Sequence, residues 1–230
     1  MARTAERSAM FILNDLNIDA LYQTIVHLYD RHDIFRIALV EDDGRPYQLL
    51  REHTELNFAD FLIDIRQESE QESKVQEIIK KYSNTVFDLS KPPICTVKLI
   101  RLADEKYIFT LETHHIVWDQ ISTFIFHKEL TQGYNNLIAT GDFGLPELKV
   151  NYVDYTEWIN ALIDSGQLES QRQYWLEKYK TIPEPLELPT DFPRPLVHSF
   201  NGDFIFKSVD LDFKQEITDF CNQNGVTYQI

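Results

Sequence analysis

ETHHIVWDQIS, residues Glu112 to Ser122, overlaps the end of the apolar and β-prone run KYIFTLET (106–113) and leads into a helical pattern. His114 and His115 are adjacent in it, and Asp119 lies four residues after the second histidine. Because side chains alternate between the two faces of a strand, the imidazoles point to opposite faces and cannot easily hold one metal ion. The stretch therefore predicts the end of a strand, with one histidine packed inside and its neighbour facing a cleft, where a base near neutral pKa is useful.

Spacing alone does not separate a structural from a catalytic role for these histidines. Asp119 could relay charge to a histidine, coordinate a cation or cap the helix that follows. Its position directly ahead of a helical run favours the cap.

Outward from this stretch, the pattern alternates between strands and amphipathic helices. Two strands, ICTVKLIRL and KYIFTLET, are separated by Ala103-Asp104-Glu105, and a hairpin is expected around Asp42-Asp43-Gly44. The other expected elements are a strand at 8–13, helices at 18–31, 57–82 (one or two), 120–138, 151–164 and 167–180, a strand at 203–211 and a helix at 213–223. Five of the nine prolines lie between Pro183 and Pro195, which predicts an extended connector there.

The composition is that of a globular protein, with 43% hydrophobic and 26% charged residues among 230, enough for one large domain or two small lobes. A net charge of −15 argues against nucleic acid and membrane surfaces as partners. Cys95 and Cys221 are the only cysteines, so a reducing cytoplasm is expected. The sequence contains no GxSxG, P-loop or GxGxxG pattern, which removes common nucleophile and nucleotide signatures.

HHIVWDQ resembles the HHxxxDG motif of the condensation domains of nonribosomal peptide synthetases. Other segments are similar to further motifs of that family, in the same order along the chain. They are RHDIFR (31–36), FDLSKPPICTVKLIRL (87–102), NYVDYTEW (151–158), QRQYWLEKYK (171–180) and LELPTDFPRP (186–195). Ordered matches over this length identify the chain as a member of the family.

The resemblance implies an α/β (α+β sandwich) fold, a chloramphenicol-acetyltransferase-like lobe whose mixed sheet is flanked by helices. Residues 1–182 would form this N-terminal condensation lobe, and 183–230 a proline-rich connector with the beginning of a C-terminal lobe. Family members run to roughly twice this length, so the rest of the C-terminal lobe is an expected partner.

The resemblance also implies an enzyme that forms an amide bond between a carrier-bound acyl or peptidyl thioester and an aminoacyl acceptor. Donor and acceptor peptidyl carrier proteins would bring both groups on phosphopantetheine, beside adjacent synthetase domains, and neither a bound cofactor nor a metal is expected. Two alternatives remain: a non-catalytic docking module, and an epimerization domain or free-standing acyltransferase of the same superfamily.

By the same resemblance His115 is the catalytic histidine, which would orient or deprotonate the amine or stabilise the tetrahedral intermediate. His114 is expected to pack and hydrogen-bond, and Asp119 to pair with Arg36 and so hold the motif loop. Gln120 replaces the family glycine, so its side chain could narrow the tunnel or restrict the backbone. Tyr152, Asp154 and Trp158 are expected in the core or at an interface.

Overall fold

The computed structural model describes residues 5–54, 56–83, 85–197 and 208–228. The chain falls into two compact units, Met1–Glu184 and Pro185–Ile230. The first contains the sheet and the histidine motif, and the second contains helix α7 (Leu211–Asn224). The expected domain division after residue 182 stays a prediction.

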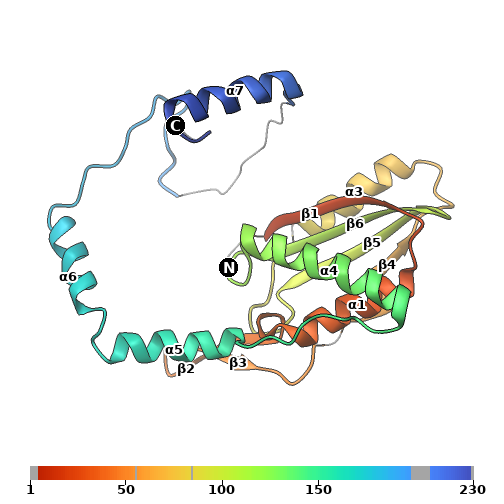
Figure 1. Ribbon diagram of the computed structural model, residues 1–230, viewed down its shortest axis with the longest axis horizontal. Helices are drawn as coiled ribbons and strands as arrows, with labels where there is room; N and C mark the ends of the chain where they lie inside the picture. The colour runs from red at the N-terminus through yellow and green to blue at the C-terminus, as the bar shows by residue number, and fades with distance from the viewer. Residues whose placement is uncertain (1–4, 55, 84, 198–207, 229–230) are drawn as a thin grey trace. The chain divides into compact units, whose positions relative to one another are not determined.

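The centre of the first unit is a mixed four-stranded sheet. Its strands lie in the order β1 (Ala5–Asn14), β6 (Lys106–His114), β5 (Cys95–Ala103) and β4 (Leu62–Asp64) (Figure 1). β6 runs antiparallel to both of its neighbours, and β4 runs parallel to β5. The expected mixed sheet flanked by helices is confirmed.

Alternation along β5 and β6 gives the sheet two buried faces. Leu99 is the register partner of Phe109, and both pack with helices α1 (Ile18–Arg31) and α4 (Gln120–Thr140). The adjacent register pair, Ile100 with Ile108, packs with α3 (Gln71–Ser83) on the other face. Full burial of one such side chain stabilises the fold by about 1.5–3 kcal/mol, so these two faces hold the strand that ends at the histidines in place.

Helix α1 forms as the apolar spacing predicts. Its N-cap residue, Asn17, accepts a hydrogen bond from the amide of Ala20 at 3.0 Å, which satisfies one of the unpaired donors of the first turn. Leu21, Ile25 and Leu28 are the predicted inward stripe, and all three are buried. The last turn of α1 and the short 3₁₀ helix η1 (Asp33–Phe35) then bring the RHDIFR segment beside α4.

The expected hairpin is confirmed as β2 (Ile37–Asp42) and β3 (Arg45–Leu50), a separate two-stranded sheet. Its turn residues Asp43 and Gly44 have φ of 48° and 73°. Positive φ at both positions is the geometry that matches the twist of the flanking strands and explains the glycine.

Two sequence expectations need correction or fall outside the described chain. Residues 57–82 are not only helical, because β4 lies between α2 (Phe58–Phe61) and α3 and pairs in parallel with β5. Charge periodicity indicated the helices, but three residues at a sheet edge are too few to give a periodic signal. The strand expected at 203–211 lies mainly on residues outside those described, and α7 begins at Leu211.

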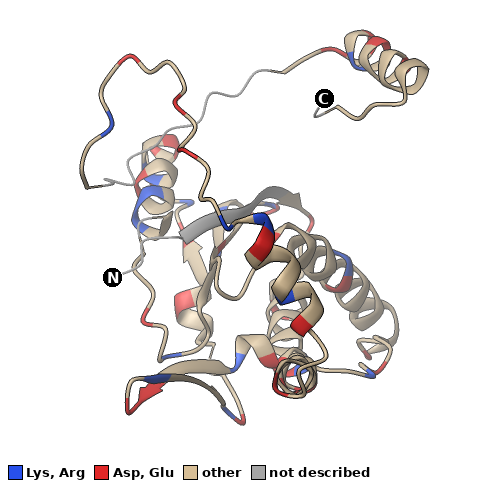
Figure 2. Cartoon of the chain, turned by 90° about the vertical axis from the view of Figure 1, so that its left-hand side faces the viewer, with Lys and Arg blue, Asp and Glu red and all other residues tan. Residues whose placement is uncertain are grey.

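Helices α5 (Tyr152–Asp164) and α6 (Glu169–Lys178) contain no buried residue. Trp158 is 57% and Tyr152 39% exposed, so neither lies in the core of the described chain, and the interface alternative stays a prediction. Acidic residues are spread over many elements (Figure 2), and they outnumber the basic residues by 37 to 22. Within the described residues, none of the helices has the length and apolar character needed to cross a membrane.

Candidate active site at the end of strand β6

His114 is the last residue of β6 and points into the packed interior. It is 5% exposed, and its Nδ1 accepts a hydrogen bond from the amide of Ile116 at 3.0 Å. The ring of Phe87 meets it edge-on at 6.4 Å between centroids. Burial, and the neighbouring His115, lower the pKa of His114 below its usual 6.5, so the ring favours the neutral form.

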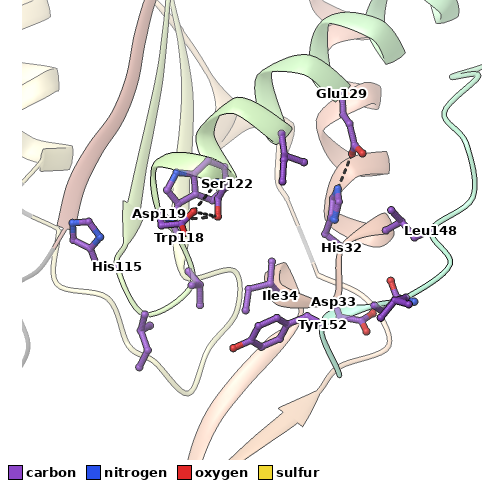
Figure 3. Close-up of a pocket in the computed structure, with 15 residues that line it drawn as sticks. His32, Asp33, Ile34, His115, Trp118, Asp119, Ser122, Glu129, Leu148 and Tyr152 are labelled. Carbon is purple, nitrogen blue, oxygen red and sulfur yellow. Dashed lines mark hydrogen bonds and ion pairs between the residues drawn. The ribbon is translucent and has the colours of Figure 1, made fainter. Parts of the chain in front are cut away.

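His115 follows the strand and is exposed. It lines a cavity of ≈ 510 Å³ whose walls come from the end of α1, η1, the loop after β6, α4 and the start of α5 (Figure 3). The end of β6 thus carries one buried imidazole, His114, and one exposed imidazole, His115, at the edge of the cavity lining.

Asp119 is the N-cap of α4. Its Oδ1 accepts a hydrogen bond from the amide of Ser122 at 2.7 Å, and its own amide donates to Oγ of Ser122 at 3.3 Å. The reciprocal bonds form a capping box. The bonds from the amide and hydroxyl of Ser122 lower the pKa of Asp119, so the carboxylate is a poor proton acceptor.

The expected ion pair between Asp119 and Arg36 is wrong for this structure. Nη2 of Arg36 donates to Oδ1 of Asp33 at 2.7 Å, and its Nη1 donates to the carbonyls of Arg51 and Glu52, both at 3.0 Å. Arg36 therefore holds η1 to the segment after β3, and Ser122 supplies the partners of Asp119 instead. The local cap satisfies the carboxylate within one helical turn, so no distant cation is needed.

Gln120 does not restrict the backbone as its replacement of a glycine suggested. It is the first residue of α4, and positive φ among the described non-glycine residues is confined to Asp15 and Asp43. Its side chain is absent from the described lining of the cavity. The glycine of the family motif is therefore not required by this backbone.

Sequence reasoning missed Glu129, which lines the cavity from α4. Its Oε2 lies 2.7 Å from Nε2 of His32 and 3.2 Å from Nε of Arg31. Burial alone would raise the pKa of Glu129, but these two hydrogen bonds and charges outweigh it and leave the pKa below its usual value. Ser122, Ile125 and Glu129 follow at i, i+3 and i+7, a spacing that indicates one face of a helix.

No group of three or more His, Cys, Asp or Glu side chains among the described residues is placed to hold a metal ion. The carboxylates of the cavity have protein partners instead: Arg36 for Asp33, Ser122 for Asp119, and His32 with Arg31 for Glu129. His115, His32 and Tyr152 also line the cavity.

The model of the condensation domain family matches residues 5–230. The chain belongs to the condensation domain family. Gramicidin S synthase 2 of Aneurinibacillus migulanus is 30% identical over 220 residues, 96% of this chain and 5% of that protein. Bacitracin synthase 1 of Bacillus licheniformis is 31% identical over 219 residues, 95% of this chain and 4% of that protein.

Solved structures confirm the fold of this condensation domain chain as the chloramphenicol-acetyltransferase-like type. The X-domain in its complex with OxyB from teicoplanin biosynthesis gives a TM-score of 0.77 at 18% identity, with 99% of this chain and 50% of that chain covered. The epimerization domain of the third module of tyrocidine synthetase B gives a TM-score of 0.67 at 22% identity, with 81% of this chain and 42% of that chain covered. The chain thus spans about half of the X-domain chain and about a twentieth of the synthetases.

Proposed function

We propose that this chain is the N-terminal half of a condensation domain that forms amide bonds in nonribosomal peptide synthesis, with His115 as the catalytic residue. The observation that supports this most directly is the alternation at the end of β6, which buries His114 and leaves His115 on the cavity. Similarity to several peptide synthetases over most of the chain supports the reaction class.

In the proposed reaction the α-amine of the acceptor attacks the carbonyl carbon of the donor thioester. A C–N bond forms, the C–S bond breaks, and the thiol of the donor's phosphopantetheine leaves. The amine must lose a proton, which an imidazole on the cavity wall can accept and pass to the departing thiolate. His115 acts either on this proton or on the oxyanion of the tetrahedral intermediate. No bound cofactor or metal takes part in this scheme.

Donor and acceptor carrier proteins and adjacent synthetase domains are the proposed partners, together with a C-terminal half of the domain. Exposed apolar side chains beside the cavity support a covering partner: Ile116 is 48% exposed, and Ile121 and Phe124 are each 63% exposed. Clustered apolar exposure of this kind marks an interface. Cys95 and Cys221 are both free, buried thiols, which suits the proposed reducing cytoplasm.

The test is peptide formation by the complete protein that carries this sequence, with loaded donor and acceptor carrier proteins. His115→Ala should lower the rate about 10²–10⁴-fold, the usual contribution of a positioned acid–base group. His53→Ala is the matched control, because the His53 side chain is 74% exposed and absent from the described cavity lining.

Equal rates for wild type and His115→Ala would remove the catalytic role. If both proteins were inert while a carrier or another synthetase domain still bound, the docking alternative would replace the proposal. Exchange of a substrate α-proton without peptide formation would favour the epimerization alternative.

A further inference from the structure

A second, smaller hollow of ≈ 120 Å³ adjoins the cavity of His115, and we name it the apolar recess. The two share much of their lining, including Ile34, Trp118 and Ile125, so a molecule bound beside His115 could extend a group into the recess. Phe35 and Phe126 line the recess only. The recess is therefore a branch of the cavity that reaches toward the core.

Three packed aromatic rings form part of its wall. Trp118, Phe35 and Phe126 are at most 5% exposed, and their ring centroids lie 5.4–6.1 Å apart. The indole Nε1 of Trp118 donates to Oγ1 of Thr123 at 2.8 Å, so its polar atom is already bonded. Rings locked in this way keep their shape and present carbon to the recess.

The two polar residues in the lining also have protein partners. Nε2 of His32 is bonded to Glu129, and Oγ of Ser122 donates to Asp119 at 2.7 Å. The described lining contains no carboxylate, lysine or arginine. A charged group placed here would lose its hydration without gaining a counter-charge, and a hydroxyl would lose hydrogen bonds to water.

We infer that the apolar recess binds a compact aliphatic side chain of the carrier-bound aminoacyl group, and so selects the substrate. This inference rests on the proposed function. A dry apolar cavity of about 150 Å³ holds benzene, so a recess of ≈ 120 Å³ takes a group of up to about five carbon atoms. Side chains such as those of valine and leucine fit this size, whereas those of phenylalanine and tryptophan exceed it.

The test compares leucyl, glycyl and phenylalanyl groups, loaded in turn on the donor and then on the acceptor carrier, with the complete protein. Leucyl should exceed glycyl by roughly 10–200-fold or more in kcat/KM in one of the two positions, since a single methylene group in an apolar pocket already gives that range. The position that responds identifies the substrate that occupies the recess.

Ile125→Trp fills the recess from α4 and should abolish the preference for leucyl, measured as the ratio of the leucyl to the glycyl kcat/KM. Ile138→Trp is the matched control, since Ile138 lies on the same helix, is 51% exposed and is absent from the described lining of both hollows. It should retain the preference. Ile125→Ala should raise turnover of phenylalanyl relative to leucyl.

Equal kcat/KM for leucyl and glycyl would overturn the inference and leave the proposed function standing. A ratio of leucyl to glycyl kcat/KM that Ile125→Trp leaves unchanged would also overturn it, because filling the recess would then not affect the choice of side chain. If no peptide forms with any substrate, the proposed function fails, and a binding measurement decides the inference. Leucyl-pantetheine, but not glycyl-pantetheine, should shift the ¹⁹F resonance of 5-fluorotryptophan at position 118, and absence of the shift counts against the recess.

Discussion

Arg36→Gln and Asp119→Asn, made singly and together, test whether these two residues interact. Asparagine caps helices about as well as aspartate, so Asp119→Asn removes the charge and keeps the cap. Because Arg36 is bonded to Asp33 and Asp119 to Ser122, the two effects should add within about 0.5 kcal/mol of unfolding free energy. The free energies are measured by urea unfolding followed by circular dichroism.

Arg36→Gln with Asp33→Asn is the positive control. The Asp33 and Arg36 side chains are 8% and 14% exposed and their bond is 2.7 Å long. A charge-assisted hydrogen bond in such a place contributes about 1.5–3 kcal/mol, so this pair should show a coupling of that order. A coupling of similar size between Arg36 and Asp119 would refute the observed pairing of Arg36 with Asp33 and restore the ion pair that the family motif implied.

Three further outcomes are expected. Asp119→Ala should lower the unfolding free energy by about 0.5–2 kcal/mol in urea, the usual cost of a lost N-cap. Gln120→Gly should lower the unfolding free energy by at most about 1 kcal/mol and leave the rate of peptide formation within about twofold of wild type. The backbone at position 120 does not have a positive φ, and its side chain is absent from the described cavity lining. Burial lowers the pKa of His27, His114 and His127 below 6.5. Below about pH 6.5 the unfolded chain therefore binds more protons than the folded chain, and the melting temperature should fall as the pH drops. A melting temperature that stays constant between about pH 7.5 and 5 would contradict this.

The strands and helices of the first unit can be predicted from the spacing of their apolar residues, because burial of those residues is what stabilises them. The alternation in ICTVKLIRL and KYIFTLET predicts two strands, and Leu99 and Ile100 then face opposite sides of the sheet. The helical spacing of residues 18–31 predicts α1 to within its observed bounds. In contrast, β4 has three residues and depends on pairing with β5, a contact between segments more than thirty residues apart.

The candidate site was only partly predictable for a related reason. The positions of His114 and His115 depend on strand alternation, which the sequence carries. Asp33 and Asp119 were both possible partners of Arg36, and the sequence does not decide between them. Asp33 pairs with Arg36 in the structure, and it lies only three residues away. Glu129 carries a readable helical spacing, but its bonds to His32 and Arg31 require the packing of α1 against α4.

The capping box gives Asp119 a geometric role at the cavity that does not depend on proton transfer. It fixes the residue at which α4 begins, and each residue along a helix turns the side chain by about 100°. Ser122 belongs to the capping box and lies on the same helix face as Ile125 and Glu129, so the cap holds the first turn of the face that lines the cavity. The carboxylate is needed for its hydrogen-bond acceptor and its position, and in the proposed function the proton chemistry belongs to His115.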